Sequence, residues 1–385
     1  MTRTGKLLAE LIALPSVNPA FAPPTGTAAG GGHSDSGNFG EKNVADYLAA
    51  VAKRSGLEVT WQKVLPQRPN LIATLRPPNR VRRRILLAPH LDTVGGDEKQ
   101  FLPQTRNGRI YGRGACDTKG SVASMLMAMI ELATSAKRPQ STEIVFAGLI
   151  DEENAQAGSR ALAASGLKAD LAIVGEPTKL SVVTAHKGNL WLRFVTRGRA
   201  AHGSTPNLGK NAIHAMARVV ELLETDYAAH LRRRSHALLG PGTVNVGRIF
   251  GGKQANIVPD FCEIVVDRRT LPGETAAGVR REILARLKAA GLSASIASGK
   301  SVPCLALETD FRLPLVQALF ACAGQTRPAG VNYFCDAAVL SAAGIPSIVF
   351  GPGDIAQAHT TDEWIRLDQL ESAKSLMVRF LSSMP

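Results

Sequence analysis

A histidine and an aspartate stand two residues apart at the end of an apolar run, RILLAPHLDTV, over residues 84–94. Side chains two residues apart on a strand project from the same face, so His90 and Asp92 are expected to lie together where a buried strand surfaces. Two interpretations are open. The aspartate satisfies a buried histidine, or the histidine binds a metal and its second ring nitrogen donates to the carboxylate.

Further acidic residues and a second histidine follow at the junctions between expected strands and helices. Asp117 lies in a glycine-bounded loop, YGRGACDTKG, before an expected helix. Glu152 and Glu153 come directly after an apolar strand, and Glu176 ends another. His359 lies in a glycine- and proline-containing loop after the strand IPSIVF. Because an α/β sheet places its active site at the carboxyl ends of its strands, these side chains are expected to converge.

Convergence of three carboxylates would put like charges in one site, which either raises their pKa values or requires cations. Histidine and carboxylate ligands without thiolates suit zinc or cobalt, and positions left open for water are typical of a catalytic site. Taken singly, an acidic residue at a strand end is usually ordinary solvated surface. If His90, Asp117, Glu153, Glu176 and His359 converge, two divalent ions would offset the charge of the three carboxylates.

The elements that would position these residues alternate between strand-like and helix-like segments. Largely apolar strands between helices indicate an α/β fold whose sheet is covered on both faces. Residues 22–40, rich in glycine, serine and proline, are expected to form a surface loop. At 385 residues the chain exceeds the roughly 250–300 residues that one hydrophobic core usually serves, so we expect two domains.

The sequence pattern changes near residue 181. A long alternating strand, a helix, two more strands and another helix predict a small α+β insert over residues 181–298. On either side, residues 1–180 and 299–385 share the same α/β rhythm. The insert is therefore expected to interrupt a catalytic domain.

Composition argues against several classes of protein. The net charge of +13 and the basic clusters at residues 80–84 and 231–236 would suit nucleic acid, but no recognition module or interleaved aromatics accompany them. Five scattered cysteines without CxxC spacing predict neither a disulfide framework nor a thiolate zinc site. No apolar run approaches the ~20 residues of a membrane span, and residues 1–19 are not typical of a signal peptide. We expect a cytoplasmic enzyme with no nucleic-acid or membrane partner.

An ordered set of short motifs resembles the zinc-dependent aminoacylase superfamily, which includes acetylornithine deacetylase, succinyl-diaminopimelate desuccinylase and carboxypeptidase G. The motifs are PSVNP, HLDTV, GRGACDTKG, DEEN, VGEPT, RGRAAHGSTP, GGKQANIVPD, DRRTLPGE and GPGDIAQAH. The resemblance runs from about residue 11 to the C-terminus, although residues 22–40 look longer than the family's loop. It implies a di-zinc catalytic domain, with a mixed sheet between helices, and an inserted α+β lid and dimerisation domain.

Carried over residue by residue, the resemblance implies that Asp117 bridges two metal ions. His90 and Glu176 would complete the site of one ion, and Glu153 and His359 that of the other. Zinc is the expected metal, with cobalt as the alternative.

The resemblance also implies roles outside the ligand set. Asp92 is expected to orient His90, and Glu152 to act as the general base. His202 would stabilise the oxyanion, often from a partner subunit, which makes a homodimer expected. Asn256 and Arg269 would hold the substrate, Arg269 by a charge-assisted pair with its α-carboxylate.

The expected reaction is metal-dependent hydrolysis of the amide bond of a small N-acyl amino acid. The segment over residues 333–359 looks closest to acetylornithine deacetylase. Succinyl-diaminopimelate desuccinylase and a dipeptidase or carboxypeptidase of the same superfamily stay open as alternatives. A metal-free binding protein is the alternative from another class, but such a relative would be expected to lack some of the ligands found here.

Overall fold

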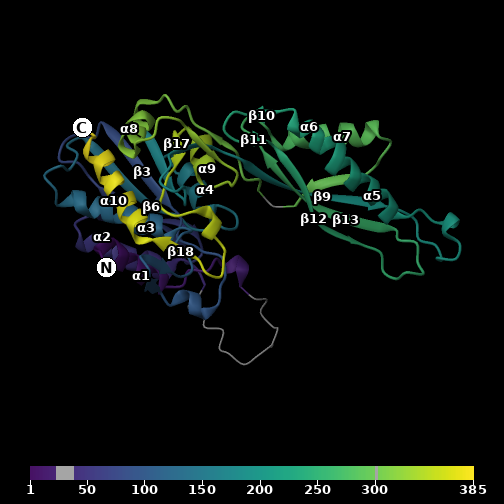
Figure 1. Cartoon of the computed structure of the whole chain (residues 1–385), viewed down its shortest axis with the longest axis horizontal. Helices are drawn as coiled ribbons and strands as arrows, with labels where there is room; N and C mark the ends of the chain where they lie inside the picture. The colour runs from purple at the N-terminus through teal and green to yellow at the C-terminus, as the bar shows by residue number, and fades with distance from the viewer. Residues whose placement is uncertain (23–38, 300–301) are drawn as a thin grey trace. The chain divides into compact units, whose positions relative to one another are not determined.

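The computed structural model describes residues 1–22, 39–299 and 302–385 (Figure 1). The expected surface loop over residues 22–40 falls almost entirely outside this part of the chain. Two compact units are present, and they consist of Met1–Thr184, Thr309–Ala329 and Cys335–Pro385 (unit 1), and of Ala185–Glu308 and Gly330–Phe334 (unit 2). Unit 2 differs from the insert expected over residues 181–298 because it continues to Glu308 and includes a second, short segment.

A mixed sheet forms the middle of unit 1. Its strands are, in spatial order, β1 (Glu58–Leu65), β2 (Arg68–Leu75), β6 (Thr142–Gly148), β3 (Arg83–Pro89), β7 (Leu171–Gly175), β17 (Ser347–Val349), β8 (Val183–His186) and β15 (Leu307–Glu308), and β16 (Ala329–Val331) also pairs with β8. The four strands from β6 to β17 are parallel, whereas β1, β2 and β8 pair antiparallel with their neighbours. The predicted α/β class with a mixed sheet is confirmed.

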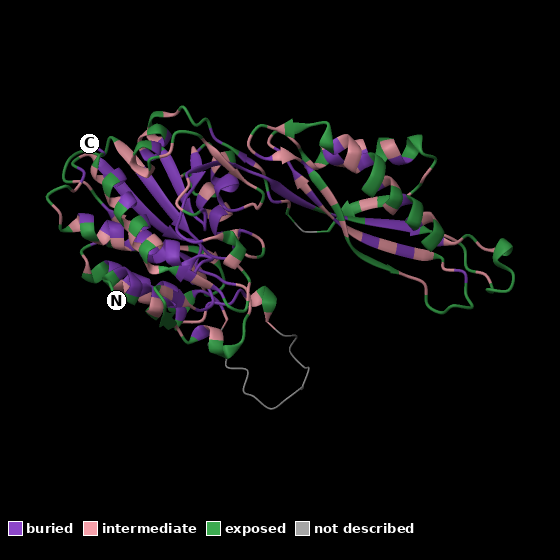
Figure 2. Cartoon of the chain, viewed as in Figure 1, coloured by how far each residue is buried: buried purple, intermediate pink, exposed green. Residues whose placement is uncertain are grey.

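Helices bury the two faces of this sheet. On β3, Ile85 and Leu87 join the main core with α3, while the alternate residue Leu86 points to the opposite face. The main-core helices are α1 (Arg3–Ile12), α2 (Lys42–Arg54), α3 (Lys119–Ala133), α8 (Pro314–Ala323) and α10 (Leu367–Ser382). Two shorter helices, α4 (Ala157–Ala164) and α9 (Ala337–Ala342), contact each other, and α9 contacts β7 and β17. The central strands β3, β6 and β7 are therefore buried almost throughout, whereas the edge strand β1 is not (Figure 2).

Helix α3 is apolar around most of its circumference, which is typical of a helix enclosed by its neighbours. Helix α10 packs along it (Figure 1). Helix α10 is amphipathic, because Leu370, Ala373, Met377 and Phe380 are buried at helical spacing. A small sheet of β4 (Gln104–Arg106), β5 (Arg109–Tyr111) and β18 (Trp364–Arg366) lies beside the start of α10. It brings the segment before α3 next to the segment before α10.

Unit 2 is built on an antiparallel sheet. Its strands are, in spatial order, β12 (Thr243–Gly251), β13 (Phe261–Thr270), β9 (Gly188–Arg197) and β14 (Ser295–Ser298). Alternate residues of β13 are buried, as in a sheet covered on one face. The covering helices are α5 (Ala212–Leu222) and α7 (Ala276–Ala289), and the core between them includes Phe194, Met216 and Ile283.

The remaining short elements are α6 (Ala228–Arg232), β10 (Ser235–His236) and β11 (Gly240–Pro241). Strand β16 pairs with β8. The chain therefore belongs to unit 2 again over Gly330–Phe334. Within residues 1–22, 39–299 and 302–385, no helix is both long and apolar enough to cross a bilayer.

Candidate metal centre

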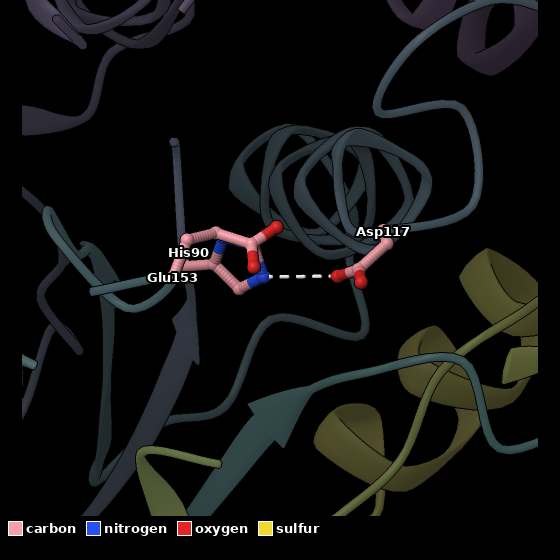
Figure 3. A group of neighbouring side chains, drawn as sticks. All are labelled: His90, Asp117 and Glu153. Atoms are coloured by element: carbon pink, nitrogen blue, oxygen red, sulfur yellow. Dashed lines mark hydrogen bonds and ion pairs between the residues drawn. The ribbon is translucent and has the colours of Figure 1, made fainter. Parts of the chain in front are cut away.

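Three side chains of unit 1 gather their ligand atoms within 4.8 Å of one another: His90, Asp117 and Glu153 (Figure 3). His90 directly follows β3, Glu153 lies beyond the end of β6, and Asp117 lies just before α3. His90 Nε2 is 3.1 Å from Asp117 Oδ1. Parallel strands β3 and β6 end at the same edge of the sheet, and this edge supplies two of the three groups.

The other two predicted ligands join this cluster. His359 Nε2 lies 3.2 Å from Glu153 Oε2 and 3.4 Å from Asp117 Oδ2. Glu176 Oε1 lies 3.8 Å from His90 Nε2. Asp117 thus presents one carboxylate oxygen to each histidine. His359 also adopts a left-handed backbone conformation (φ 62°), which non-glycine residues take mainly at constrained sites.

Burial and charge act together on the carboxylates. Burial raises the pKa of Glu176 well above its ordinary value; His90 opposes this and Asp117 adds to it. Burial also raises the pKa of Glu153, again with help from Asp117. Burial opposes ionisation of Asp117 as well, but hydrogen bonds to His359 and His90 hold its pKa below the ordinary value. A buried cluster of this kind gains stability from added positive charge.

The surroundings of one buried carboxylate oxygen indicate whether a cation fits this cluster. Glu176 Oε1 is buried and accepts no hydrogen bond from the described part of the chain. Such an atom ordinarily has a partner, and a divalent ion can be one. Imidazole and carboxylate groups without thiolates are also a donor set that zinc and cobalt accept. The residues present therefore fit a divalent metal.

Asp92 contacts both the His90 side chain and the loop that bears Glu152 and Glu153. His90 Nδ1 lies 3.0 Å from the Asp92 carbonyl oxygen and 3.4 Å from its Oδ1. The predicted proximity of this pair holds, although strand β3 ends at Pro89, before both residues. The Asp92 carboxylate also accepts hydrogen bonds from the main-chain N–H groups of Glu152 and Glu153, each at 3.1 Å. One buried side chain thus fixes the loop that presents both glutamates.

Glu152 is 8 % exposed and stands beside the cluster. Burial raises its pKa well above the ordinary value; His90 opposes this, while Glu176 and Asp336 add to it. A carboxylate with a raised pKa is a stronger proton acceptor than an ordinary glutamate, as a general base requires. The pKa of His359 is raised as well, to about 10, because hydrogen bonds to Asp117 and Glu153 stabilise its protonated form.

Several buried residues of this site were not among the sequence candidates. Asn18 Nδ2 donates to Asp92 Oδ2 at 2.7 Å, and Asp336 accepts a hydrogen bond from Ser159 at 2.5 Å. Burial raises the pKa of Asp336 to about 6. Asn18 lies in PSVNP, one of the ordered motifs, so the motif was the available signal. Glu363, which directly precedes β18, was also missed.

The three remaining candidates lie in unit 2. His202 Nδ1 is 2.7 Å from Ser204 Oγ, and the main-chain N–H of Gly203 donates to the Asn256 carbonyl at 2.7 Å. His202 and Asn256 are therefore on adjoining loops. Arg269, on β13, pairs with Asp267 at 3.1 Å. The structure thus brings His202 and Asn256 together within unit 2, whereas the metal-ligand candidates gather within unit 1.

Comparisons of the sequence and of the structure with known proteins agree on one family of hydrolases. Residues 86–383 match the model of peptidase family M20/M25/M40. An acetylornithine deacetylase of Proteus mirabilis (strain HI4320) is 32 % identical over 98 % of this chain and 96 % of its own length. An M20 family metallo-carboxypeptidase of Sulfolobus solfataricus has a TM-score of 0.76 at 20 % identity over 99 % of both chains.

A second solved structure, a dinuclear metal binding peptidase of the M20 family from Bacillus subtilis, has a TM-score of 0.70 at 15 % identity. The match covers 99 % of this chain and 97 % of that one. At these identities the two solved structures establish a shared fold over nearly the whole chain.

Proposed function

Because the chain belongs to peptidase family M20/M25/M40, whose members are metallohydrolases acting on amide bonds, we propose that it removes the acyl group of N-acetylornithine. The observation that carries the proposal is the buried cluster of two histidines and three carboxylates in unit 1. The similarity to an acetylornithine deacetylase over almost the full length supports the choice of substrate.

The proposed centre holds two divalent ions, zinc by preference and cobalt as the alternative. Asp117 would be shared by the two ions, a role supported by its two oxygens facing different histidines, His90 and His359. Glu176 completes the first site and Glu153 the second. When bound, such ions act as Lewis acids on water and on the scissile carbonyl at neutral pH.

The chain's own residues supply the proton transfers and the orientation. Glu152 accepts a proton from the attacking water and later delivers it to the leaving amine. Asp92 supports both tasks, because it contacts His90 and fixes the main chain of Glu152. His202 stabilises the oxyanion, while Asn256 and Arg269 hold the substrate, the latter by its α-carboxylate.

The substrate is tested with a panel of N-acetylornithine, N-succinyl-diaminopimelate, small N-acyl amino acids and dipeptides. Amine release should be fastest from N-acetylornithine and should disappear when a chelator removes the metal, because the carboxylate cluster then lacks its Lewis acids. The measurement compares zinc- and cobalt-loaded protein with chelated protein. Readdition of metal to the chelated sample is the control for irreversible damage.

Each outcome of this panel has a distinct meaning. Faster release from the succinylated substrate or a dipeptide would replace the proposed substrate and leave the reaction class standing. Chelator-insensitive release would contradict the metal centre itself.

We further propose that unit 2 serves as lid and dimerisation domain, and that the protein is a homodimer. Strand β12 is an edge strand of unit 2 and exposes Ile249 and Phe250 by 57 % and 62 %. An exposed apolar edge is a ready surface for strand addition by a second copy of the chain. A homodimer would also allow His202 to act on the site of the partner subunit.

A complementation experiment tests this arrangement. His202→Ala should lower kcat by about 10²–10³-fold, the usual loss of one oxyanion donor, without changing metal content. Mixing refolded His202→Ala and Glu152→Gln chains should then restore up to about a quarter of wild-type activity, because half of the dimers carry one complete site. His230→Ala, a second histidine of unit 2, is the control. Failure of the mixture to recover activity would place His202 in the site of its own chain.

A further inference from the structure

Glu363 is a buried carboxylate that is hydrogen-bonded to the loop bearing Asp117. It lies four residues after His359, directly before β18, and is 1 % exposed. Its oxygens accept four hydrogen bonds: Oε1 from Cys116 N (2.8 Å) and Asp117 N (3.0 Å), and Oε2 from Gly114 N (2.9 Å) and Arg113 Nη1 (2.8 Å). Three of the four donors are main-chain N–H groups of the loop that ends in Asp117.

The same two segments are joined a second time through their main chains. The N–H of Gly112 donates to the carbonyl oxygen of Glu363 at 3.0 Å. Gln100 Nε2 donates to the carbonyl oxygens of Thr360 and Thr361, at 3.2 and 2.9 Å, directly after His359. The Gln100 carbonyl in turn accepts from the N–H of Arg113 at 2.7 Å. Two ligand-bearing segments that are far apart in sequence therefore form one hydrogen-bonded unit.

We infer that Glu363 is a positioning residue of the metal centre, which holds the Asp117 and His359 segments in register so that both can bind the ion that they share. This inference rests on the proposed metal-binding function. Charge-assisted bonds to main-chain N–H groups fix a loop more firmly than neutral ones do. Groups that orient ligands in this way typically set metal affinity although they touch no metal.

A buried ion pair between Arg113 and Glu363 that serves stability alone is the competing explanation. Such a pair needs only the guanidinium, at 2.8 Å, to balance the carboxylate. Here the carboxylate instead directs one whole oxygen at the N–H groups of Cys116 and Asp117. The two explanations therefore differ in what they predict for metal binding.

The variant Glu363→Gln distinguishes a positioning role from an ion pair that serves stability alone. The amide keeps the shape of the carboxylate but retains one acceptor oxygen, and its NH₂ group then faces two donors. We expect zinc and cobalt to bind about 10–100-fold more weakly, as measured by chelator competition, and the visible spectrum of the cobalt-loaded protein to change. The control is Glu143→Gln, which removes another buried, ion-paired carboxylate at the far end of β6. It should lower the melting temperature without altering the metal constants.

Each outcome decides the inference. Wild-type metal constants and an unchanged cobalt spectrum in Glu363→Gln would overturn it, whatever the melting temperature. If that variant does not fold, Arg113→Gln takes its place: we expect metal binding weaker than in wild type, and unchanged binding would overturn the inference. Absence of metal binding by the wild-type protein would instead overturn the proposed function, and the inference with it.

Discussion

Glu152→Gln should lower the rate of amide hydrolysis by about 10²–10⁴-fold while the protein keeps its metal ions. Glutamine fills the same space but cannot carry a proton from water to the leaving amine. Its main-chain N–H still has the Asp92 carboxylate as its acceptor, so the loop that bears Glu153 should stay in place. The measurement is kcat on N-acetylornithine together with metal content per chain.

Two comparisons make this result specific to Glu152. Glu143→Gln removes a buried carboxylate of the same unit, at the opposite end of β6 from the ligands, and should keep near-wild-type kcat. Zinc and cobalt content of Glu152→Gln should match that of wild type, because no predicted ligand is changed. A rate within tenfold of wild type would show that another group takes the proton.

The residues of the cluster that follow strands could be predicted from the sequence. His90, Glu153 and Glu176 each follow an apolar segment that becomes a parallel strand, and parallel strands end at one edge of their sheet. The residue types then indicate a metal. Asp117 and His359 come from loops, so their expected place depended on the ordered motifs as much as on periodicity.

Glu363, and the bonds of Asp92 to the main chain of Glu152 and Glu153, could not be predicted from the sequence, for a physical reason. Glu363 and Asp92 accept hydrogen bonds from main-chain N–H groups. Every residue except proline has such a group, so the residue types of a sequence do not indicate which ones will be bound. Only the tertiary fold decides which loop turns its N–H groups toward them. The segment Gly330–Phe334 escaped prediction similarly, because it joins unit 2 where β16 pairs with β8, a long-range contact without a local signal.

Asp117→Ala should abolish binding of both metal ions, and hydrolysis with it. In the proposed centre Asp117 would be shared by both ions, because one of its oxygens lies 3.1 Å from His90 Nε2 and the other 3.4 Å from His359 Nε2. Loss of a shared ligand should weaken binding by more than the roughly 10–100-fold cost of losing an outer supporting group. Metal equivalents per chain after dialysis against micromolar zinc provide the measurement.

Glu176→Ala supplies the matched comparison, because Glu176 pairs with His90, forms no ion pair with His359 in the described part of the chain, and is proposed to serve a single ion. This variant should therefore retain about one metal ion per chain under conditions in which Asp117→Ala retains none. The same stoichiometry in both variants would mean that Asp117 does not bridge. The difference between them thus tests the geometry of the centre directly, whereas the loss of activity expected of both variants would only show that each residue is needed.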